Sequence, residues 1–95
     1  MDKKKLKLSV VLAVFNEAKN IRACLDAVRD VASEIIVVDG GSTDGTADAA
    51  KKAGAKVYRT DNPPIFHINK QKAVELAKGE WILQLDADEI VSQAL

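Results

Sequence analysis

Residues 81–91 have the sequence WILQLDADEIV, in which an apolar run leads directly into three carboxylates. The apolar run covers residues 81–85, and the carboxylates belong to Asp86, Asp88 and Glu89. A short apolar run of this length is typical of a buried strand. The segment therefore predicts a buried strand with clustered negative charge at its carboxyl end, and the place of that end in the fold decides what the charge can do.

Alternating strand and helix patterns precede this segment. Valine-rich or strand-forming runs predict strands at residues 7–15, 34–39 and 55–60. Apolar residues at helical spacing and alanine-rich stretches predict helices at residues 16–31, 42–54 and 68–79. Cys24 lies on the apolar stripe of the first helix, so we expect it in the core rather than as a reactive thiol.

The expected helix ends carry residues that commonly cap helices. Asn16 is the predicted cap of the first helix, and Ser42 or Thr43 that of the second. Gly54 and Gly79 are expected to close the second and third helices.

This alternation predicts an α/β fold: a Rossmann-like parallel sheet with helices on both faces. Crossovers between parallel strands are right-handed, so the first two helices share one face and the fourth strand lies on the other side of the first. The predicted strand order is 3-2-1-4. Ligands of open parallel sheets bind beyond the carboxyl ends of the strands, where the strand order reverses. We therefore expect the carboxylates of residues 86–89 at the mouth of a crevice.

Asp86 and Asp88 are the predicted metal ligands at this crevice. Two carboxylates offer hard oxygen atoms to Mn²⁺ or Mg²⁺, which complete their shells with water and phosphate oxygens, as a nucleotide diphosphate would supply. A solvated acidic turn is the alternative for an isolated Asp-x-Asp pair, and the expected position at the switch point favours a ligand site.

The glycine-rich segment DGGSTDGT, residues 39–46, does not fit the dinucleotide-binding fingerprint. It also follows the second strand rather than the first, which disfavours a nicotinamide-dependent dehydrogenase. Gly40 and Gly41 are expected to permit a tight turn.

Composition excludes several classes of protein. The 14 basic and 14 acidic residues cancel, so no basic surface for nucleic acid is expected. A single cysteine allows no disulfide within the chain. The apolar run at residues 8–15 is too short to span a bilayer. We expect a cytoplasmic protein, with the inner face of the membrane as a further location.

Three segments, in order, resemble the motifs of family 2 glycosyltransferases, which have the GT-A fold. They are LSVVLAVFNEAKNI at 8–21, IIVVDGGSTDGT at 35–46 and AKGEWILQLDADE at 77–89. The resemblance is greatest to the bacterial branch with lipopolysaccharide-core-type transferases. It implies transfer of a sugar from a nucleotide diphosphate donor to an acceptor hydroxyl, usually with inversion, and an acceptor that is a glycan or a lipid-linked sugar.

The resemblance also implies roles for individual residues. Asp88 would coordinate the metal that bridges the donor phosphates, and Asp86 would face the ribose or assist the metal. Phe15 would place its ring against the base, and Ala13 would line the base pocket. Asp39 would help to order the nucleotide pocket.

Two departures from the family pattern concern the same pocket. Lys70 stands where the family often has an arginine, and lysine lacks the planar bidentate geometry of arginine. Gly40 stands where many members carry a second acid that recognises the base. Glu17, directly after the first strand, completes the predicted nucleotide-sugar-binding set.

No convincing general base is present in the sequence, and the family places it downstream of the Asp-x-Asp pair, here beyond Leu95. We expect residues 1–95 to form one domain, the nucleotide-sugar-binding N-terminal portion of a larger catalytic domain. Peripheral membrane association of the full-length protein, and self-association of this portion through an exposed side of its fourth strand, are further expectations.

Two other functional classes remain open from the residues alone. A nucleotidyltransferase would carry a glycine-rich basic loop after the first strand, where this chain has FNEAKN. A non-catalytic nucleotide-binding or scaffold module is the second alternative.

Overall fold

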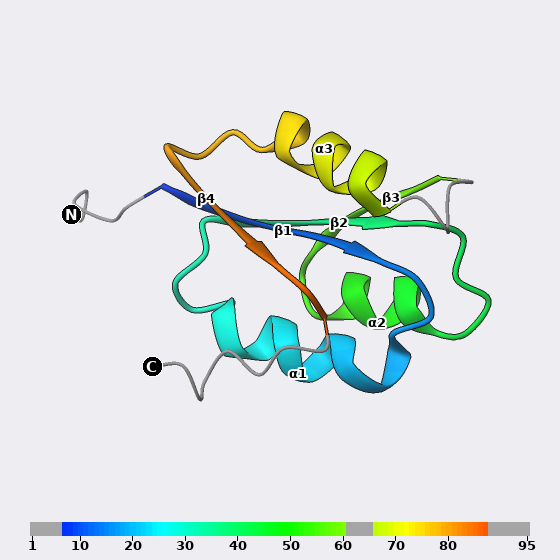
Figure 1. The fold of residues 1–95 in the computed structure, drawn as a ribbon. Coiled ribbons are helices and arrows are strands. Elements are labelled where there is room, and N and C mark those ends of the chain that lie inside the picture. Colours follow the sequence, from blue (N-terminus) through cyan, green and yellow to red (C-terminus); the bar gives the residue numbers. More distant parts are fainter. Residues whose placement is uncertain (1–6, 61–65, 88–95) are drawn as a thin grey trace.

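The computed structural model of the chain describes residues 7–60 and 66–87 (Figure 1). Strands and helices alternate along these residues. Their bounds are β1 Leu8–Val14, α1 Ala18–Val28, β2 Glu34–Asp39, α2 Thr46–Lys52, β3 Lys56–Arg59, α3 Phe66–Leu76 and β4 Trp81–Leu85.

The strands form one parallel sheet in the order β3-β2-β1-β4, which confirms the predicted order. Val10 in β1 pairs with Ile35 in β2 on one side and with Leu83 in β4 on the other. Val14, the last residue of β1, pairs with Asp39, the last residue of β2. The carboxyl ends of these strands therefore lie at the same edge of the sheet.

Helices cover both faces of the sheet, with α1 and α2 on one face and α3 on the other (Figure 1). The larger core cluster includes the buried stripe of α1, namely Ile21, Cys24, Leu25 and Val28. The smaller cluster under α3 contains Val11, Ile36, Val38 and Ala73. Cys24 is 3% exposed, which confirms its predicted place in the core.

The predicted helix caps were wrong for α1 and α2. Helix α1 follows Glu17 and has no side-chain cap, and α2 follows Gly45. Asn16 instead adopts a left-handed conformation, with φ of 53°, and bonds to the loop after β2. Ser42 also belongs to that loop and lies several residues before α2. The Asn16 and Ser42 side chains bond to partners distant in sequence instead of capping the neighbouring helices.

Gly54 ends α2 as predicted. Its φ is 97°, a left-handed conformation that glycine adopts without steric cost. The Gly54 N–H donates to the Lys51 carbonyl at 3.0 Å, and the Ala55 N–H donates to the Ala50 carbonyl at 3.1 Å. This pair of bonds is the Schellman motif, which satisfies carbonyls of the last helical turn.

Gly79 does not close α3, because the helix ends at Leu76. A Cβ atom on Gly79 would lie 2.6 Å from the Lys7 carbonyl oxygen and 2.6 Å from Ser9 Oγ. The glycine therefore allows the turn before β4 to approach the start of β1 closely.

A polar cluster around Glu34 holds this end of the sheet together. Glu34 Oε2 accepts hydrogen bonds from Ser9 Oγ at 2.5 Å and from the Lys78 N–H at 2.7 Å. Ser9 Oγ in turn accepts the Gly79 N–H at 2.8 Å. The Lys56 ammonium lies 3.4 Å from Glu34 Oε1. The cluster joins β1, β2, β3 and the turn before β4. The Glu34 side chain at its centre is 12% exposed, whereas the Lys56 side chain is 58% exposed.

Strand β4 is less buried than its apolar sequence predicted. It is an edge strand, and within it only Leu85 is buried. Trp81 is 60% exposed, Ile82 43% and Leu83 38%. The prediction that β4 is buried was wrong. The prediction that one side of β4 is exposed is confirmed. The opposite edge strand, β3, is more polar than β4, because it carries the charged residues Lys56 and Arg59.

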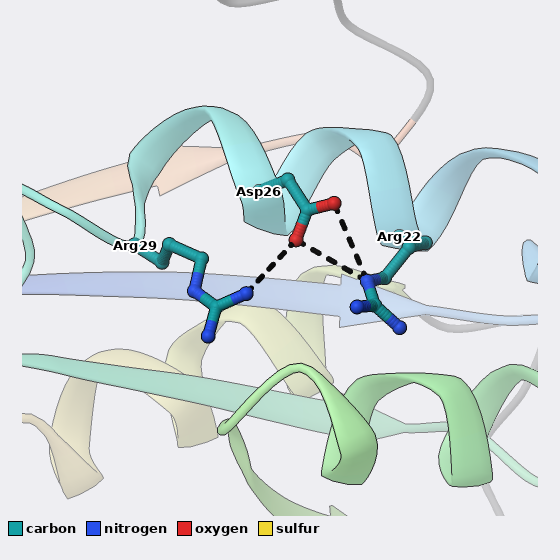
Figure 2. A network of polar contacts seen from close by, with 3 residues as sticks. All are labelled: Arg22, Asp26 and Arg29. Atoms are coloured by element: carbon teal, nitrogen blue, oxygen red, sulfur yellow. Dashed lines mark hydrogen bonds and ion pairs between the residues drawn. The ribbon is translucent and has the colours of Figure 1, made fainter.

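The outer face of α1 carries an exposed ion-pair network. Figure 2 shows Asp26 between Arg22 and Arg29, with nitrogen to oxygen distances of 3.2 and 3.4 Å. All three side chains are about half exposed. Pairs of this kind contribute only about 0–1 kcal/mol to stability, so the fold depends on its two apolar clusters and on partly buried polar contacts such as the hydrogen bond between Ser9 and Glu34.

Candidate functional site

Polar residues meet at the carboxyl edge of the sheet, where the strand order reverses. Ala13 pairs with Val38 and is followed by Val14 opposite Asp39. Leu12 pairs with Leu85, the last residue of β4, so Asp86 leaves the sheet at the same edge. The structure thus brings Ala13, Asp39 and Asp86 to one region, as the sequence predicted.

Asp39 is the most constrained residue at this edge. It is fully buried, and its Oδ1 accepts the N–H groups of Gly41 at 2.9 Å and Ser42 at 2.7 Å. Its Oδ2 is also buried and has no hydrogen-bond partner among the described residues. A buried polar atom without a partner is costly. A ligand N–H or O–H group that reached Oδ2 would supply the missing hydrogen bond.

Side-chain to backbone bonds tie the loop after β1 to the loop after β2. The Asn16 N–H donates to Ser42 Oγ at 2.7 Å, and the Thr43 N–H donates to Asn16 Oδ1 at 2.9 Å. The Glu17 N–H donates to Thr46 Oγ1 at 2.8 Å. These bonds fix the backbone on both sides of Asn16 relative to Asp39.

Asp44 adds a further tie between the same loops. Its carboxylate accepts the N–H groups of Ala18 at 3.2 Å and Thr46 at 3.0 Å, and the Thr46 hydroxyl. The hydrogen bond from the Thr46 hydroxyl is the main cause that lowers the pKa of Asp44. Sequence reasoning missed the loop-fixing role of this segment. The available signal was the run of Ser, Thr and Asp, whose short side chains bond to nearby backbone.

Phe15 and Glu17 are held by these loops. Phe15 is half-buried directly after β1. Glu17 Oε1 accepts a hydrogen bond from Asn20 Nδ2 at 3.1 Å, which directs this carboxylate to the first turn of α1. Ala13 is 8% exposed and therefore forms part of the wall rather than the opening.

Lys70 and Asp86 form an ion pair, with 3.3 Å between Nζ and Oδ1. The pair joins the first half of α3 to the end of β4. Asn69 holds this part of the helix, since it is fully buried and accepts a hydrogen bond from Thr60 Oγ1 at 3.2 Å. The Thr60 N–H donates to the Asp39 carbonyl at 2.7 Å. Two predicted site residues are thus in direct contact, and a third is linked to them through Thr60 and Asn69.

The predicted metal site is only partly covered by the structure. Asp88 lies outside the described residues. Within residues 7–60 and 66–87, no three His, Cys, Asp or Glu side chains gather as a metal centre. The Asp86 carboxylate pairs with the Lys70 ammonium at the strand end, so the site already accommodates positive charge of the kind that a divalent ion would bring. The assignment of Asp86 and Asp88 as metal ligands stays a prediction.

This fold defines an α/β protein with an open parallel sheet, and polar residues meet at its switch point, where ligands of such sheets bind. A model of the family described as glycosyl transferase family 2 matches residues 9–95. The chain therefore belongs to glycosyl transferase family 2, as its motifs predicted.

Two of three related sequences are glycosyltransferases, and the third is a TPR repeat-containing protein. An uncharacterized glycosyltransferase of Rickettsia bellii is 38% identical over 90 residues, which are 94% of this chain and 30% of the relative. Glycosyltransferase SunS of Bacillus phage SPbeta is 38% identical over 86% of this chain and 20% of its own length. A TPR repeat-containing protein of Synechococcus elongatus is 43% identical over 86% of this chain and 20% of its own. The chain thus spans less than a third of these relatives.

Solved structures share the fold. Glucosyl-3-phosphoglycerate synthase from Mycobacterium tuberculosis, in complex with Mn²⁺, uridine diphosphate (UDP) and glucosyl-3-phosphoglycerate, superposes with a TM-score of 0.75 at 27% identity. The match covers 90% of this chain and 35% of that one. Mannosyl-3-phosphoglycerate synthase from Rubrobacter xylanophilus gives 0.71 at 28% identity, over 87% and 31% of the two chains. These matches confirm the predicted fold class.

No helix in the described part of the chain is both long enough and apolar enough to cross a bilayer.

Proposed function

We propose that this chain is the nucleotide-sugar-binding N-terminal part of a glycosyltransferase domain. The complete domain transfers a sugar from a nucleotide diphosphate donor to an acceptor hydroxyl, with inversion at the anomeric carbon. The observation that carries the proposal is the buried Asp39 carboxylate, which has one oxygen fully bonded and the other without a partner among the described residues. It lies at the edge where ligands of open parallel sheets bind.

A nucleoside fits the groups at this edge. A base or ribose supplies the N–H or O–H donor that Asp39 Oδ2 lacks. The half-buried Phe15 would offer a ring face to the base, and the small Ala13 on the same strand end would line the base pocket. The M. tuberculosis synthase, which shares this fold, was solved with UDP and Mn²⁺. That complex supports the same ligand class for this chain.

The diphosphate of the donor belongs near Asp86, Asp88 and Lys70. When bound, a divalent cation neutralises the charge that builds on the leaving phosphate as the sugar bond breaks. Asp86 and Asp88 would hold it, and the Lys70 ammonium lies beside Asp86 to meet a phosphate oxygen. The hydrogen bond between Thr60 and Asn69 anchors the helix backbone next to that lysine.

Metal dependence is testable on nucleotide binding alone. Mn²⁺ or Mg²⁺ should strengthen UDP binding by about tenfold, because a cation held by Asp86 and Asp88 would offset the negative charge of the phosphates. Asp88→Asn should remove most of this gain, as should EDTA. Calorimetric titration with UDP measures both. Equal affinities with and without metal, in the wild type and the variant, would show that the metal assignment is wrong.

Base recognition should depend on stacking more than on hydrogen bonds specific to one base. Gly40 offers no side chain to a base edge, whereas a ring face serves every base. Phe15→Ala should weaken the binding of UDP, guanosine diphosphate and adenosine diphosphate by similar factors, equivalent to about 1 kcal/mol, because the ring is already half-buried. Competition titrations give the three affinities. Strong UDP preference in the wild type would contradict this and assign the discrimination to Asp39 or to a backbone group.

The remaining steps need groups other than those assigned here to nucleotide-sugar binding. Inversion requires a general base at the acceptor hydroxyl, and the family places it after the Asp-x-Asp pair. We assign the acceptor to the glycans or lipid-linked sugars used by lipopolysaccharide-core-type members. Peripheral membrane association of the full-length protein would bring the site to such an acceptor.

Self-association of this portion is proposed through β4. Trp81, Ile82 and Leu83 form an exposed apolar edge without a charged side chain, and such edges template pairing with another strand.

A further inference from the structure

We infer that Lys70 is the resident counter-cation of Asp86, and that it exchanges this place with the divalent ion when a nucleotide diphosphate binds. Without nucleotide the ammonium occupies the carboxylate and opposes metal binding. With nucleotide it moves to the phosphates and favours metal binding. The inference rests on the proposed function and adds to it the order of charge exchange at the site.

The Lys70–Asp86 contact has the properties that such an exchange needs. Nζ lies 3.3 Å from Oδ1, close enough for the ammonium to neutralise the carboxylate. The lysine side chain is 42% exposed and the aspartate side chain 52%, so water screens the pair. Exposed pairs of this kind are weak. A divalent ion with phosphate ligands can therefore displace the ammonium.

The backbone beneath Lys70 is anchored while its side chain remains adaptable. Asn69, its neighbour, is fully buried and bonds to Thr60, and Ala73 packs into the core under α3. The lysine stem carries a compact charge on four flexible carbons, so Nζ can shift while the helix stays in place. Arginine, with its fixed planar fork, would be less suited to two different partners.

The charges predict effects of opposite sign in the two states. Without nucleotide, a positive charge beside Asp86 repels an incoming Mn²⁺ ion, and its removal should strengthen Mn²⁺ binding. With nucleotide, the diphosphate brings negative charge that the ammonium can meet directly through charge-assisted hydrogen bonds. Its removal should then weaken binding of the nucleotide and its metal.

The experiment measures Mn²⁺ affinity by electron paramagnetic resonance titration, with and without saturating UDP. The proteins are the wild type, Lys70→Met, Lys70→Arg and the control Lys72→Met, which removes an exposed lysine from the same helix. Lys70→Met should bind Mn²⁺ about threefold more tightly than the wild type without UDP, and about threefold more weakly with it. Lys72→Met should change neither value, and Lys70→Arg should keep the wild-type value without UDP.

Each other result has a defined meaning. The counter-cation role is wrong if Lys70→Met has the same Mn²⁺ affinity as the wild type without UDP. It is also wrong if Lys70→Met and Lys72→Met change the Mn²⁺ affinity by the same factor. If Lys70→Met shifts Mn²⁺ affinity in the same direction with and without UDP, no exchange occurs. If the wild type binds no Mn²⁺ even with UDP, the proposed function itself fails. Circular dichroism of each variant confirms that the fold is retained.

Discussion

Replacing Asp39 with asparagine is expected to lower the affinity for UDP by about a hundredfold and to leave the fold intact. The asparagine Oδ1 can still accept the N–H groups of Gly41 and Ser42, so the turn after β2 keeps its bonds. The asparagine NH₂ group replaces Oδ2, the acceptor without a partner. An NH₂ group cannot accept a hydrogen bond from an N–H or O–H group of the ligand. Calorimetric titration with UDP measures the affinity, and thermal unfolding measures the fold.

Two further variants separate ligand recognition from stability. Asp39→Ala removes both acceptors and leaves the buried Ser42 N–H unpaired, so unfolding should become easier by about 2–4 kcal/mol. Asp48→Asn removes a carboxylate from the exposed surface of α2 and should change neither property. If Asp39→Asn binds UDP as tightly as the wild type does, the assignment of Asp39 to the nucleotide pocket is wrong.

Replacing Glu34 with alanine should lower the free energy of unfolding by about 2–4 kcal/mol, although Glu34 lies at the opposite end of the strands from the site. The substitution removes the acceptor for Ser9 Oγ and for the Lys78 N–H, and the partner of Lys56. Hydrogen bonds to a charged group that is largely out of solvent are among the stronger polar contributions. Urea unfolding at pH 7 measures the loss.

The same residue predicts a dependence of stability on pH. Burial by itself would raise the pKa of Glu34, but the hydrogen bonds from Ser9 and Lys78 and the Lys56 ammonium outweigh it and hold the pKa below its usual value. A lowered folded-state pKa means that the stabilisation is complete above the unfolded-chain pKa of about 4.3. It is lost as the pH falls further, through the folded-state pKa. Urea unfolding between pH 7 and pH 3 should show a larger loss in the wild type than in Glu34→Ala, in which the lowered pKa of Asp44 still contributes.

Asp26→Ala is the matched control for Glu34. It also removes a carboxylate with two polar side-chain partners, but its ion pairs are about half exposed (Figure 2). Its cost should therefore stay below about 1 kcal/mol. Equal costs for Asp26→Ala and Glu34→Ala would show that the cluster around Glu34 has no special role in stability.

Much of the fold followed from patterns that are local in sequence. Strand and helix periodicity predicted each element of the described chain, and the right-handed crossover rule converted their order into 3-2-1-4. Because parallel strands end at the same edge, this order was enough to bring Phe15, Asp39 and Asp86 together. Cys24 was placed in the core by helical spacing alone.

The details of the site depended on contacts between residues far apart in the chain. Asn16 and Ser42 have the side chains of helix caps, yet each side chain bonds to the other's loop, across 27 and 26 residues of sequence respectively. Gly79 resembles a helix terminator, and the close approach of β1 gives it a different role. Local propensity cannot predict such partners, because several partners satisfy the same side chain and only the fold determines which is near.

Exposure and charge pairing were decided by tertiary structure for the same reason. The apolar sequence of β4 predicted burial, but its place at the sheet edge leaves Trp81, Ile82 and Leu83 accessible. Lys70 was expected near the nucleotide, and only the packing of α3 against the sheet shows that its partner is Asp86. The sequence by itself determined which elements form and which strand ends meet. The tertiary structure decided which side chains pair, because pairing depends on distances that no local pattern encodes.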